Sequence, residues 1–218
     1  MSIRFIDPEK YYRKDSYKKF TKDYHCSFAM TSRIDVTDLV DCSRKRGSKF
    51  YIDFLYVLSK AVNSRDDYKM IYLYKENKLG VFDKVNVTHY VFHDNTETCT
   101  PVHTEYDSDY RKFYQSISDD IERGKEGKYV PDPEKDYSDY YDASFLPWFS
   151  YDAFSLELPD GYLYFLPIIN WGKYRIENDR LMMPLSIRLN HAAADGYLAS
   201  KFYLLVEAEM KAFVLDKE

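Results

Sequence analysis

The sequence predicts a single α+β domain in which helices pack on one mixed β-sheet. Strand-like and helix-like apolar patterns follow one another irregularly along all 218 residues. No internal repeat, low-complexity tract or linker divides the chain, and this length is ample for one large core. A strand pattern over residues 180–189 leads directly into a long amphipathic helix pattern over 197–214. We therefore treat residues 1–218 as one domain.

The N-terminal half contains clear start and stop signals between its apolar segments. Asp7 and Pro8 have the pattern of an N-cap and a first-turn proline, Thr37 is expected to cap a second helix, and Gly47 interrupts the helical pattern. A turn at Asn77 separates two strand patterns. The expected elements are helices over residues 8–21, 37–44 and 50–63, and strands over 24–36, 69–75, 78–83 and 85–93.

The C-terminal half contains one long loop region, marked by Gly, Pro and many charges, over residues 124–142. The other expected elements are a helix over 110–123, strands over 149–158, 162–169 and 180–189, and a helix over 197–214. Leu198, Phe202, Leu205 and Ala208 follow one another at helical spacing. We interpret this stripe as core packing against the sheet and not as a cofactor-binding motif.

Composition excludes several classes of function. The net charge is −5 and basic residues are interleaved with acidic ones, which argues against a nucleic-acid binder. The longest apolar runs are far shorter than a membrane span. Charged residues occupy the part of the N-terminus where a signal peptide needs its apolar region, so we expect a cytoplasmic protein.

The cysteine and histidine patterns predict neither a disulfide framework nor a metal site. Cys26, Cys42 and Cys99 are an odd number without C-x-x-C spacing. His89 and His93 are four residues apart, but their surroundings have a strand pattern that would not place both rings on one face. Aromatic residues make up 18% of the chain, which fits an aromatic-walled pocket or a subunit interface, or else a tyrosine-rich surface.

The segment 189–196, LNHAAADG, contains the most informative motif in the chain. It delivers His191 at a strand end and places Asp195 and Gly196 four and five residues later. The imidazole can act as a general base near neutral pH, and the alanines leave room for a ligand beside it. The alternative is structural, because Asp-Gly before an apolar helix is an ordinary N-cap and a strand histidine is often only packed or solvated.

Other blocks extend this motif along the chain. They are YRK at residues 12–14, KFY at 49–51, VFH and TET at 91–93 and 96–98, PWFSYDAF at 147–154, LPII at 166–169, GKY at 172–174 and DRLMMPLSI at 179–187. In this order, from about residue 5 to 212, the sequence resembles the chloramphenicol acetyltransferase family. The resemblance implies that family's fold, an antibiotic-resistance type of activity, and a homotrimer whose active sites lie between subunits, one of which supplies the histidine.

The resemblance assigns roles to three residues around the motif. His191 matches the family's general base, which acts in a ternary complex and forms no covalent intermediate. Asp195 matches an aspartate that pairs with an arginine rather than with the histidine, and that arginine is Arg13. We therefore expect a buried ion pair that shapes the site. From its surroundings alone, Arg13 would be interpreted as a solvated helix residue.

The resemblance also implies acetyl-CoA as a cosubstrate and no metal. Lys49 and Lys173 match family positions near the nucleotide, and Tyr174 matches a position that can stack on adenine. A lysine ammonium suits a phosphate, and an aromatic face suits a base. Without the resemblance, these residues are indistinguishable from surface lysine and tyrosine side chains.

Two departures concern stabilisation of the oxyanion. The family uses a serine where this chain has Ala153, and a methyl group cannot donate a hydrogen bond. One lost oxyanion donor costs on the order of 10²–10³ in rate. Ser150 lies nearby, and Asn170 replaces a family threonine that acts through water, so these two are the candidate donors. Asn190 replaces a second histidine that is not the base.

A third departure concerns the acceptor pocket. Family members line it with tyrosine, leucine and phenylalanine, where this chain has Phe20, Tyr24 and Cys99. Cys26 is retained, and Ala153 borders the same pocket. Hydrophobic reshaping of this kind changes selectivity by about 1–3 kcal/mol per methylene-sized difference.

The function expected from the sequence is acetyl-CoA-dependent O-acetylation of chloramphenicol or another hydroxylated small molecule. One alternative is a dihydrolipoyl acyltransferase-like core, although the chain has no lipoyl domain or flexible linker. Another is a non-catalytic or weakly active binding protein that retains the fold. Ala153 favours this last reading, whereas the joint presence of His191, Asp195 and Arg13 opposes it.

Overall fold

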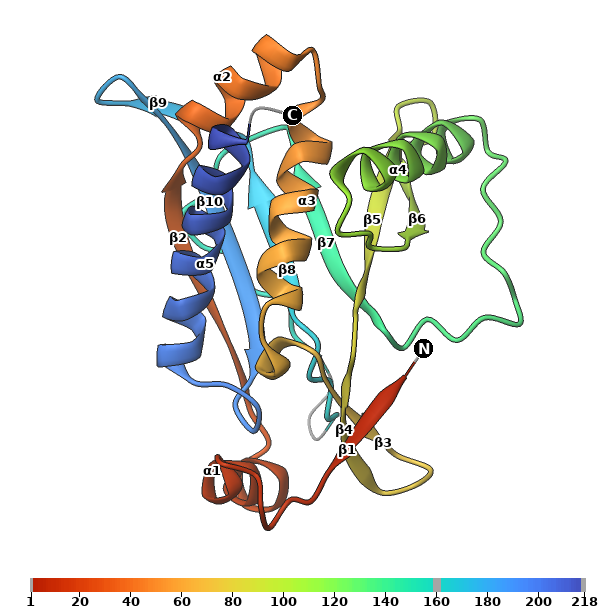
Figure 1. Cartoon of the computed structure of the whole chain (residues 1–218), viewed down its shortest axis with the longest axis vertical. Helices are drawn as coiled ribbons and strands as arrows, with labels where there is room; N and C mark the ends of the chain where they lie inside the picture. The colour runs from red at the N-terminus through yellow and green to blue at the C-terminus, as the bar shows by residue number, and fades with distance from the viewer. Residues whose placement is uncertain (1, 159–161, 217–218) are drawn as a thin grey trace.

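The computed structural model describes residues 2–158 and 162–216. The chain forms a seven-stranded sheet with helices on one of its faces, and a separate three-stranded sheet near the N-terminus (Figure 1). The prediction of an α+β fold with a mixed sheet is confirmed. The second, smaller sheet was not predicted.

The helical elements follow the expected order, with changes at their ends. The described helices and turns are α1 (Lys14–Lys18), the π-helical turn η1 (Lys19–Asp23), α2 (Thr37–Arg46), α3 (Phe50–Asn63), the 3₁₀ turn η2 (Asp66–Tyr68), α4 (Tyr110–Lys125) and α5 (Gly196–Leu215). Helix α3 has the predicted bounds. Gly47 ends α2 in a left-handed conformation with φ of 68°, which explains the break between α2 and α3.

The strands are β1 (Ile3–Ile6), β2 (Ser27–Asp35), β3 (Met70–Leu73), β4 (Lys78–Phe82), β5 (Asn86–His93), β6 (Thr98–Thr104), β7 (Tyr140–Leu146), β8 (Ile168–Gly172), β9 (Arg175–Glu177) and β10 (Arg180–Asn190). The larger sheet has the order β2-β10-β8-β7-β5-β6, and β9 pairs with β10. Strand β7 is parallel to β5 and β8, while the other pairings are antiparallel. Strands β2 and β6 are therefore the edges of the ordered path.

The small sheet has the order β1-β4-β3. Strand β1 was not predicted, because it is only four residues long and none of it is fully buried. Gly80 on β4 allows the close approach of β1, since a Cβ there would lie 2.6 Å from the Ile3 side chain. This sheet ties the N-terminus to the segment that follows α3.

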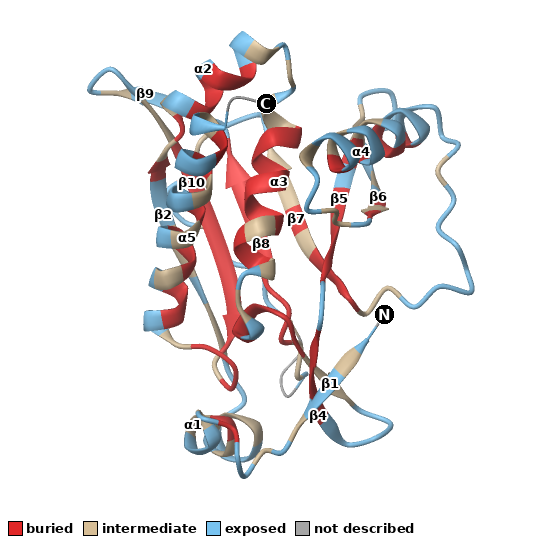
Figure 2. Ribbon diagram, in the orientation of Figure 1, coloured by how far each residue is buried: buried red, intermediate tan, exposed pale blue. Residues whose placement is uncertain are grey.

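The core lies between the large sheet and helices α2, α3 and α5, which cover one face (Figures 1 and 2). On β10, the odd-numbered residues Met183, Leu185, Ile187 and Leu189 point into this core. The even-numbered residues therefore face the other side. Helix α5 contributes Leu198 and Phe202, as its predicted apolar stripe required, while Leu205 is half-buried and Ala208 is exposed. Helix α4 covers β5 and β6 and also packs on α3, so it extends the same core.

Two predicted elements near the N-terminus were wrong in detail. The helix expected over residues 8–21 begins only at Lys14, because the Asp7 carboxylate accepts a hydrogen bond from the Glu9 backbone and closes a local turn instead. Thr37 is inside α2 and does not cap it. The Asp35 carboxylate accepts the Thr37 N–H at 3.0 Å and takes the role predicted for Thr37.

Several predicted strands were also wrong. Residues 149–158 form no strand, and only the end of the 162–169 segment belongs to one, namely β8. Strands β6 and β9 were not predicted, and β7 begins inside the region predicted as a loop. Within the segment 149–158 only Tyr151 is buried against the sheet, while Phe149 and Leu156 are exposed, so its apolar pattern reflects neither backbone pairing nor a continuous packed face.

Candidate active site

His191 occupies the first position after β10 and has a defined tautomer. Its backbone N–H donates to the Cys26 carbonyl at 3.0 Å, which joins the end of β10 to the residue before β2. Its ring Nδ1 lies 3.0 Å from the Ala194 carbonyl oxygen. A carbonyl can only accept, so we assign the proton to Nδ1. The lone pair on Nε2 is then free to accept a proton from a ligand.

Two aromatic rings fix the plane of the imidazole. Phe20 stacks on it with a centroid separation of 4.0 Å and an interplanar angle of 5°. Phe28 contacts it at 5.3 Å in a tilted arrangement. Phe20 was predicted to line the acceptor pocket, and the structure places it on the base itself. Because three elements surround the ring, His191 is held in one orientation.

Arg13 and Asp195 form the predicted ion pair, with 2.9 Å between the Arg13 Nη2 and the Asp195 carboxylate. The pair is less buried than predicted, since the Arg13 side chain is 13% exposed and that of Asp195 37%. Burial disfavours the charge on each group. The hydrogen bonds from the Leu198 backbone and Arg13 nevertheless hold the pKa of Asp195 below its usual range, and the bond to Asp195 raises the pKa of Arg13.

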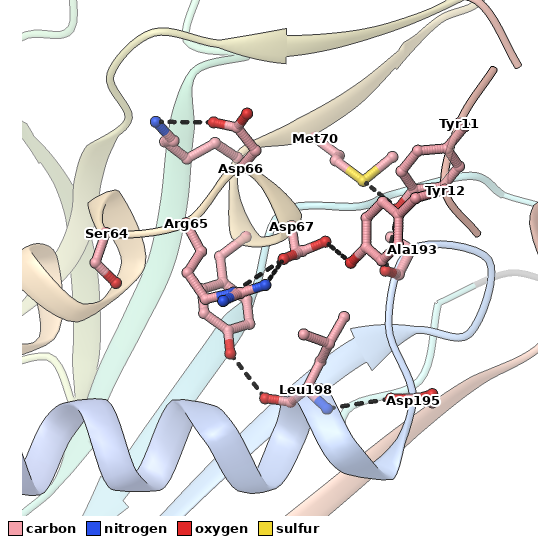
Figure 3. Close-up of polar contacts among 12 residues, drawn as sticks. Tyr11, Tyr12, Ser64, Arg65, Asp66, Asp67, Met70, Ala193, Asp195 and Leu198 are labelled. Atoms are coloured by element: carbon pink, nitrogen blue, oxygen red, sulfur yellow. Dashed lines mark hydrogen bonds and ion pairs between the residues drawn. The ribbon is translucent and has the colours of Figure 1, made fainter.

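Asp195 is at the same time the N-cap of α5, because its carboxylate accepts the Leu198 N–H at 3.1 Å. Asp195 therefore has the structural role of a helix N-cap in addition to its ion pair with Arg13. The alanine loop between His191 and Asp195 has its own supports. The Asn190 side chain accepts the Ala192 N–H at 2.9 Å, and the Tyr11 hydroxyl lies 3.5 Å from the Ala193 carbonyl (Figure 3).

The candidate oxyanion donors lie on the sheet face away from the helices. Asn170 is buried on β8, and its carbonyl accepts the Tyr151 hydroxyl at 2.8 Å. The Ser150 hydroxyl is buried and has no hydrogen-bond partner among the described residues. Ala153 is exposed, and the next residue's backbone N–H donates to the Thr31 hydroxyl at 3.3 Å. These contacts fix the segment that carries Ala153 against β2 and β8.

The predicted coenzyme residues gather at the opposite end of the sheet from His191. Lys49 precedes α3, and its neighbour Phe50 contacts the Tyr174 ring edge-on at 6.3 Å. Lys49 and Lys173 are both exposed. Trp171 lies opposite Leu185 in the β8–β10 register, six residues before His191. At about 3.3 Å per strand residue, this group is roughly 20 Å from the imidazole.

The predicted acceptor-pocket residues divide between the two edges of the sheet. Cys26 and the exposed Tyr24 precede β2, whereas the exposed Cys99 lies on β6 opposite Phe92. The sheet order places five strand spacings between β2 and β6. At about 4.8 Å each, the two edges are roughly 24 Å apart, so one small molecule does not contact both within one chain.

Some residues that shape this region gave no recognisable signal in the sequence. Phe28 reaches His191 because β2 pairs with β10 in a register that places Phe28 opposite Leu189. Tyr151 reaches Asn170 through a side-chain contact that no local pattern encodes. In both cases the signal is the pairing of distant segments, which periodicity within one segment does not contain.

Residues 2–158 and 162–216 contain neither a metal-binding cluster nor a membrane-spanning helix. No group of three or more His, Cys, Asp or Glu side chains there is arranged to hold a metal ion. No helix among them combines the length and apolar character needed to cross a bilayer.

Comparison with known proteins gives a consistent result. The family model described as chloramphenicol acetyltransferase matches residues 1–206. A protein of Escherichia coli named chloramphenicol acetyltransferase 3 is 32% identical over 202 residues, covering 93% of this chain and 94% of that protein. A chloramphenicol acetyltransferase of Clostridium butyricum is 31% identical, covering 93% and 92%. A solved structure titled chloramphenicol acetyltransferase superposes with a TM-score of 0.84 at 20% identity, covering 96% of this chain and 100% of that one.

Proposed function

Because the chain belongs to the chloramphenicol acetyltransferase family and is an acyltransferase, we propose that it transfers the acetyl group of acetyl-CoA to a hydroxyl of chloramphenicol or of another hydroxylated small molecule. The observation that supports this most strongly is the state of His191. Its Nδ1 is engaged by a carbonyl and its ring plane is fixed, so Nε2 is left as the only basic atom of the ring.

The proposed reaction takes place in a ternary complex. Nε2 of His191 accepts the proton of the acceptor hydroxyl as its oxygen attacks the thioester carbonyl. The tetrahedral oxyanion then collapses, the C–S bond breaks, and the imidazolium returns the proton to the departing thiolate. The Ala194 carbonyl stabilises the imidazolium by accepting the Nδ1 hydrogen bond throughout. No covalent enzyme intermediate is required.

The oxyanion needs a donor that Ala153 does not provide. The Ser150 hydroxyl is available because no described residue engages it, and Asn170 carries amide N–H groups on the same side of the sheet. We propose that one of these groups on the neighbouring copy, directly or through water, partly replaces the family serine, since within one chain Asn170 lies opposite Ser186, roughly 17 Å along the strand from His191. The protein is then a slower enzyme towards chloramphenicol than a family member with that serine.

The coenzyme is proposed to bind where Lys49, Lys173 and Tyr174 lie together. The exposed Lys173 and Lys49 ammonium groups, the latter 3.9 Å from the Glu122 carboxylate, offer positive charge to phosphates, and an aromatic face beside them suits adenine. Acetyl-CoA as cosubstrate also favours the cytoplasm as the site of action.

The separation of the acceptor residues supports a homotrimer with active sites between subunits. The β2 edge of one chain holds His191, and the β6 edge holds Cys99. If the β2 edge of one copy faces the β6 edge of the next, the two groups enclose a single acceptor. Closed rotational symmetry repeats this contact at every interface.

The dihydrolipoyl alternative is not favoured, since the curated relatives described above carry the name chloramphenicol acetyltransferase. The other alternative, a weakly active or non-catalytic binding protein, would bind the same ligands as the enzyme and would differ from it only in the rate of acetyl transfer. The deciding experiment is release of free thiol from acetyl-CoA, measured with and without chloramphenicol and with a panel of other hydroxylated compounds. Acceptor-dependent release supports the proposal, whereas binding without release with every acceptor contradicts it.

A further inference from the structure

We propose that the turn η2 holds together the two chain segments that carry the Arg13–Asp195 pair, and that Asp67 and Tyr68 are therefore positioning residues for His191. This inference rests on the proposed role of His191 as the base. One segment runs from Tyr11 to Phe20 and supplies Arg13 and the ring stacked on the imidazole. The other is the loop from His191 to Asp195 and the start of α5. Both contact η2 (Figure 3).

Asp67 holds the first segment. Its side chain is buried, with only 5% of the residue exposed, yet it carries a carboxylate. Arg65 donates to one carboxylate oxygen through Nε at 2.9 Å and through Nη2 at 2.7 Å. The Tyr12 hydroxyl donates to the other oxygen, although the Tyr12 residue as a whole is 68% exposed. An exposed ring whose hydroxyl reaches a buried carboxylate is anchored by that hydroxyl.

The bond between Tyr12 and Asp67 has the character of a charge-assisted hydrogen bond. Burial of the hydroxyl and its bond to Asp67 raise the pKa of Tyr12 to about 12, so Tyr12 remains a donor at neutral pH. Hydrogen bonds to an ionised acceptor are about twice as strong as neutral ones. Arg13 follows Tyr12 directly, so this contact also restrains Arg13.

Tyr68 holds the second segment. It is completely buried, and its hydroxyl donates to the Leu198 carbonyl at 2.7 Å. The N–H of the same Leu198 is the donor that Asp195 caps. Asp67 is thus bonded to Tyr12, the residue before Arg13. Its neighbour Tyr68 is bonded to Leu198, whose N–H is capped by Asp195. The distance between the two partners of the ion pair is therefore set by η2.

The neighbouring Asp66 provides a matched control. It is a carboxylate on the same turn, but it is 57% exposed and pairs with Arg4 and Lys69, away from the His191 loop. Figure 3 shows Asp66 directed away from Asp67 and its partners. Removing its charge disturbs η2 locally and leaves both contacts to the site segments in place.

The test compares Asp67→Asn, Tyr12→Phe and the double variant with Asp66→Asn. We expect each single variant to lower kcat about tenfold with KM for acetyl-CoA changed by less than about twofold, since a small misplacement of a base lowers turnover more than binding. The double variant should fall no further than the lower single one, because both changes remove the same contact. Tyr12→Phe removes only the hydroxyl of an exposed residue and should therefore fold. It tests the same contact even if Asp67→Asn does not fold.

A second measurement does not depend on activity. Because Phe20 stacks on His191, its ring current is expected to displace the imidazole C–H proton resonances upfield, and His191→Gln would assign them by their disappearance. In Tyr12→Phe and Asp67→Asn we expect these resonances to move towards unstacked positions, and in Asp66→Asn to stay in place. If the imidazole resonances move in Tyr12→Phe and Asp67→Asn but the unmodified protein does not transfer acetyl groups, the positioning role stands and only the proposed function is contradicted.

Three outcomes would overturn the positioning role. The first is unchanged imidazole resonances in both Tyr12→Phe and Asp67→Asn. The second is a lowered melting temperature with kcat at a temperature well below it unaffected, which indicates a purely structural contact. The third is an equal loss of kcat in Asp66→Asn, which would show that any disturbance of η2 suffices.

Discussion

The two edges of the large sheet differ in how completely one chain defines them. At the β2 edge, His191 is fixed by a backbone bond to Cys26, a ring bond to Ala194 and two aromatic contacts, all within the chain. At the β6 edge, Cys99 is exposed, and the Phe92–Trp148 ring pair beside it leaves Trp148 54% exposed. From this difference and the proposed function, we propose that each chain carries a finished catalytic half and an unfinished acceptor half.

This contrast has a physical reason. A base must be oriented before the acceptor arrives, and contacts inside one chain achieve that without any dependence on assembly. A pocket for a small apolar molecule needs walls on opposite sides. If a second copy of the chain packs on the exposed aromatic side chains at the β6 edge, it supplies the opposite wall of such a pocket. We therefore expect changes at the β2 edge to affect turnover and changes at the β6 edge to affect acceptor binding.

Removing the base gives the largest expected effect on the finished half. His191→Ala should lower turnover by about 10²–10⁴, because the proton then has no positioned acceptor. Affinity for acetyl-CoA, measured by calorimetry, should remain near that of the unmodified protein, since the proposed coenzyme residues lie roughly 20 Å away along the sheet. Turnover retained within about tenfold would remove His191 from the role of base.

Restoring an oxyanion donor gives the next largest effect. Ala153→Ser should raise kcat about tenfold or more with chloramphenicol, because a correctly aimed hydroxyl stabilises charge only as it develops. The segment is already fixed by the bond from the Phe154 backbone to Thr31, so the new side chain has a defined starting point. Ala208→Ser, on an exposed position of α5, is the matched control. An unchanged kcat would mean that Ser150, Asn170 or water already supplies the donor.

Removing Asp195 has a smaller effect, which is expected on stability as well as on activity. Asp195→Ala deletes a helix N-cap and leaves Arg13 without its carboxylate, so the free energy of unfolding should fall by about 1–3 kcal/mol. The estimate is below that for a fully buried pair because the Asp195 side chain is 37% exposed. Chemical denaturation measures this loss. Asp41→Ala, which removes an exposed partner of Arg44, should change stability much less. Lost activity with unchanged stability would indicate that Asp195 acts directly in the chemistry.

The smallest effect is the pH dependence of the same pair. The pKa of Asp195 is lowered in the folded protein, so its contribution to stability is present above its unfolded pKa and is lost as the pH falls through the folded value. The difference in melting temperature between the unmodified protein and Asp195→Asn should be constant from about pH 8 to pH 5 and should shrink below about pH 4. A difference that grows in acid would contradict the assigned sign.

The sequence predicted those parts of the fold whose signals are local. Helix α3 was predicted to the residue. Gly47 adopts a left-handed conformation that ends the preceding helix, and a continuous apolar pattern follows it. The helix at residues 8–21 was wrong because the Asp7 side chain bonds two residues ahead, which an N-cap motif does not distinguish from a helix start. The strand at 149–158 was wrong because only Tyr151 of its apolar residues is buried on the sheet, through its side chain, while Phe149 and Leu156 stay exposed.

The candidate site follows the same division. The Arg13–Asp195 pair was predicted through the family resemblance, whose motifs join residues that are distant in sequence. The contact of Phe28 with His191 and the network of Asp67 were not predicted, because they depend on the register of β2 on β10 and on the position of η2. The split of the acceptor residues between two edges became visible only when the strand order was known.

The central claim, that one active site combines the β2 edge of one copy with the β6 edge of another, is tested most directly by complementation. His191→Ala inactivates the catalytic half, and Cys99→Trp is designed to fill the acceptor half; each variant is first shown to lack turnover alone. Equal amounts are then unfolded together and refolded into mixed assemblies. Random mixing should restore about a quarter of the activity, because one interface in four joins two intact halves. No recovery in assemblies shown to be mixed would contradict the shared site and place the whole reaction within one chain.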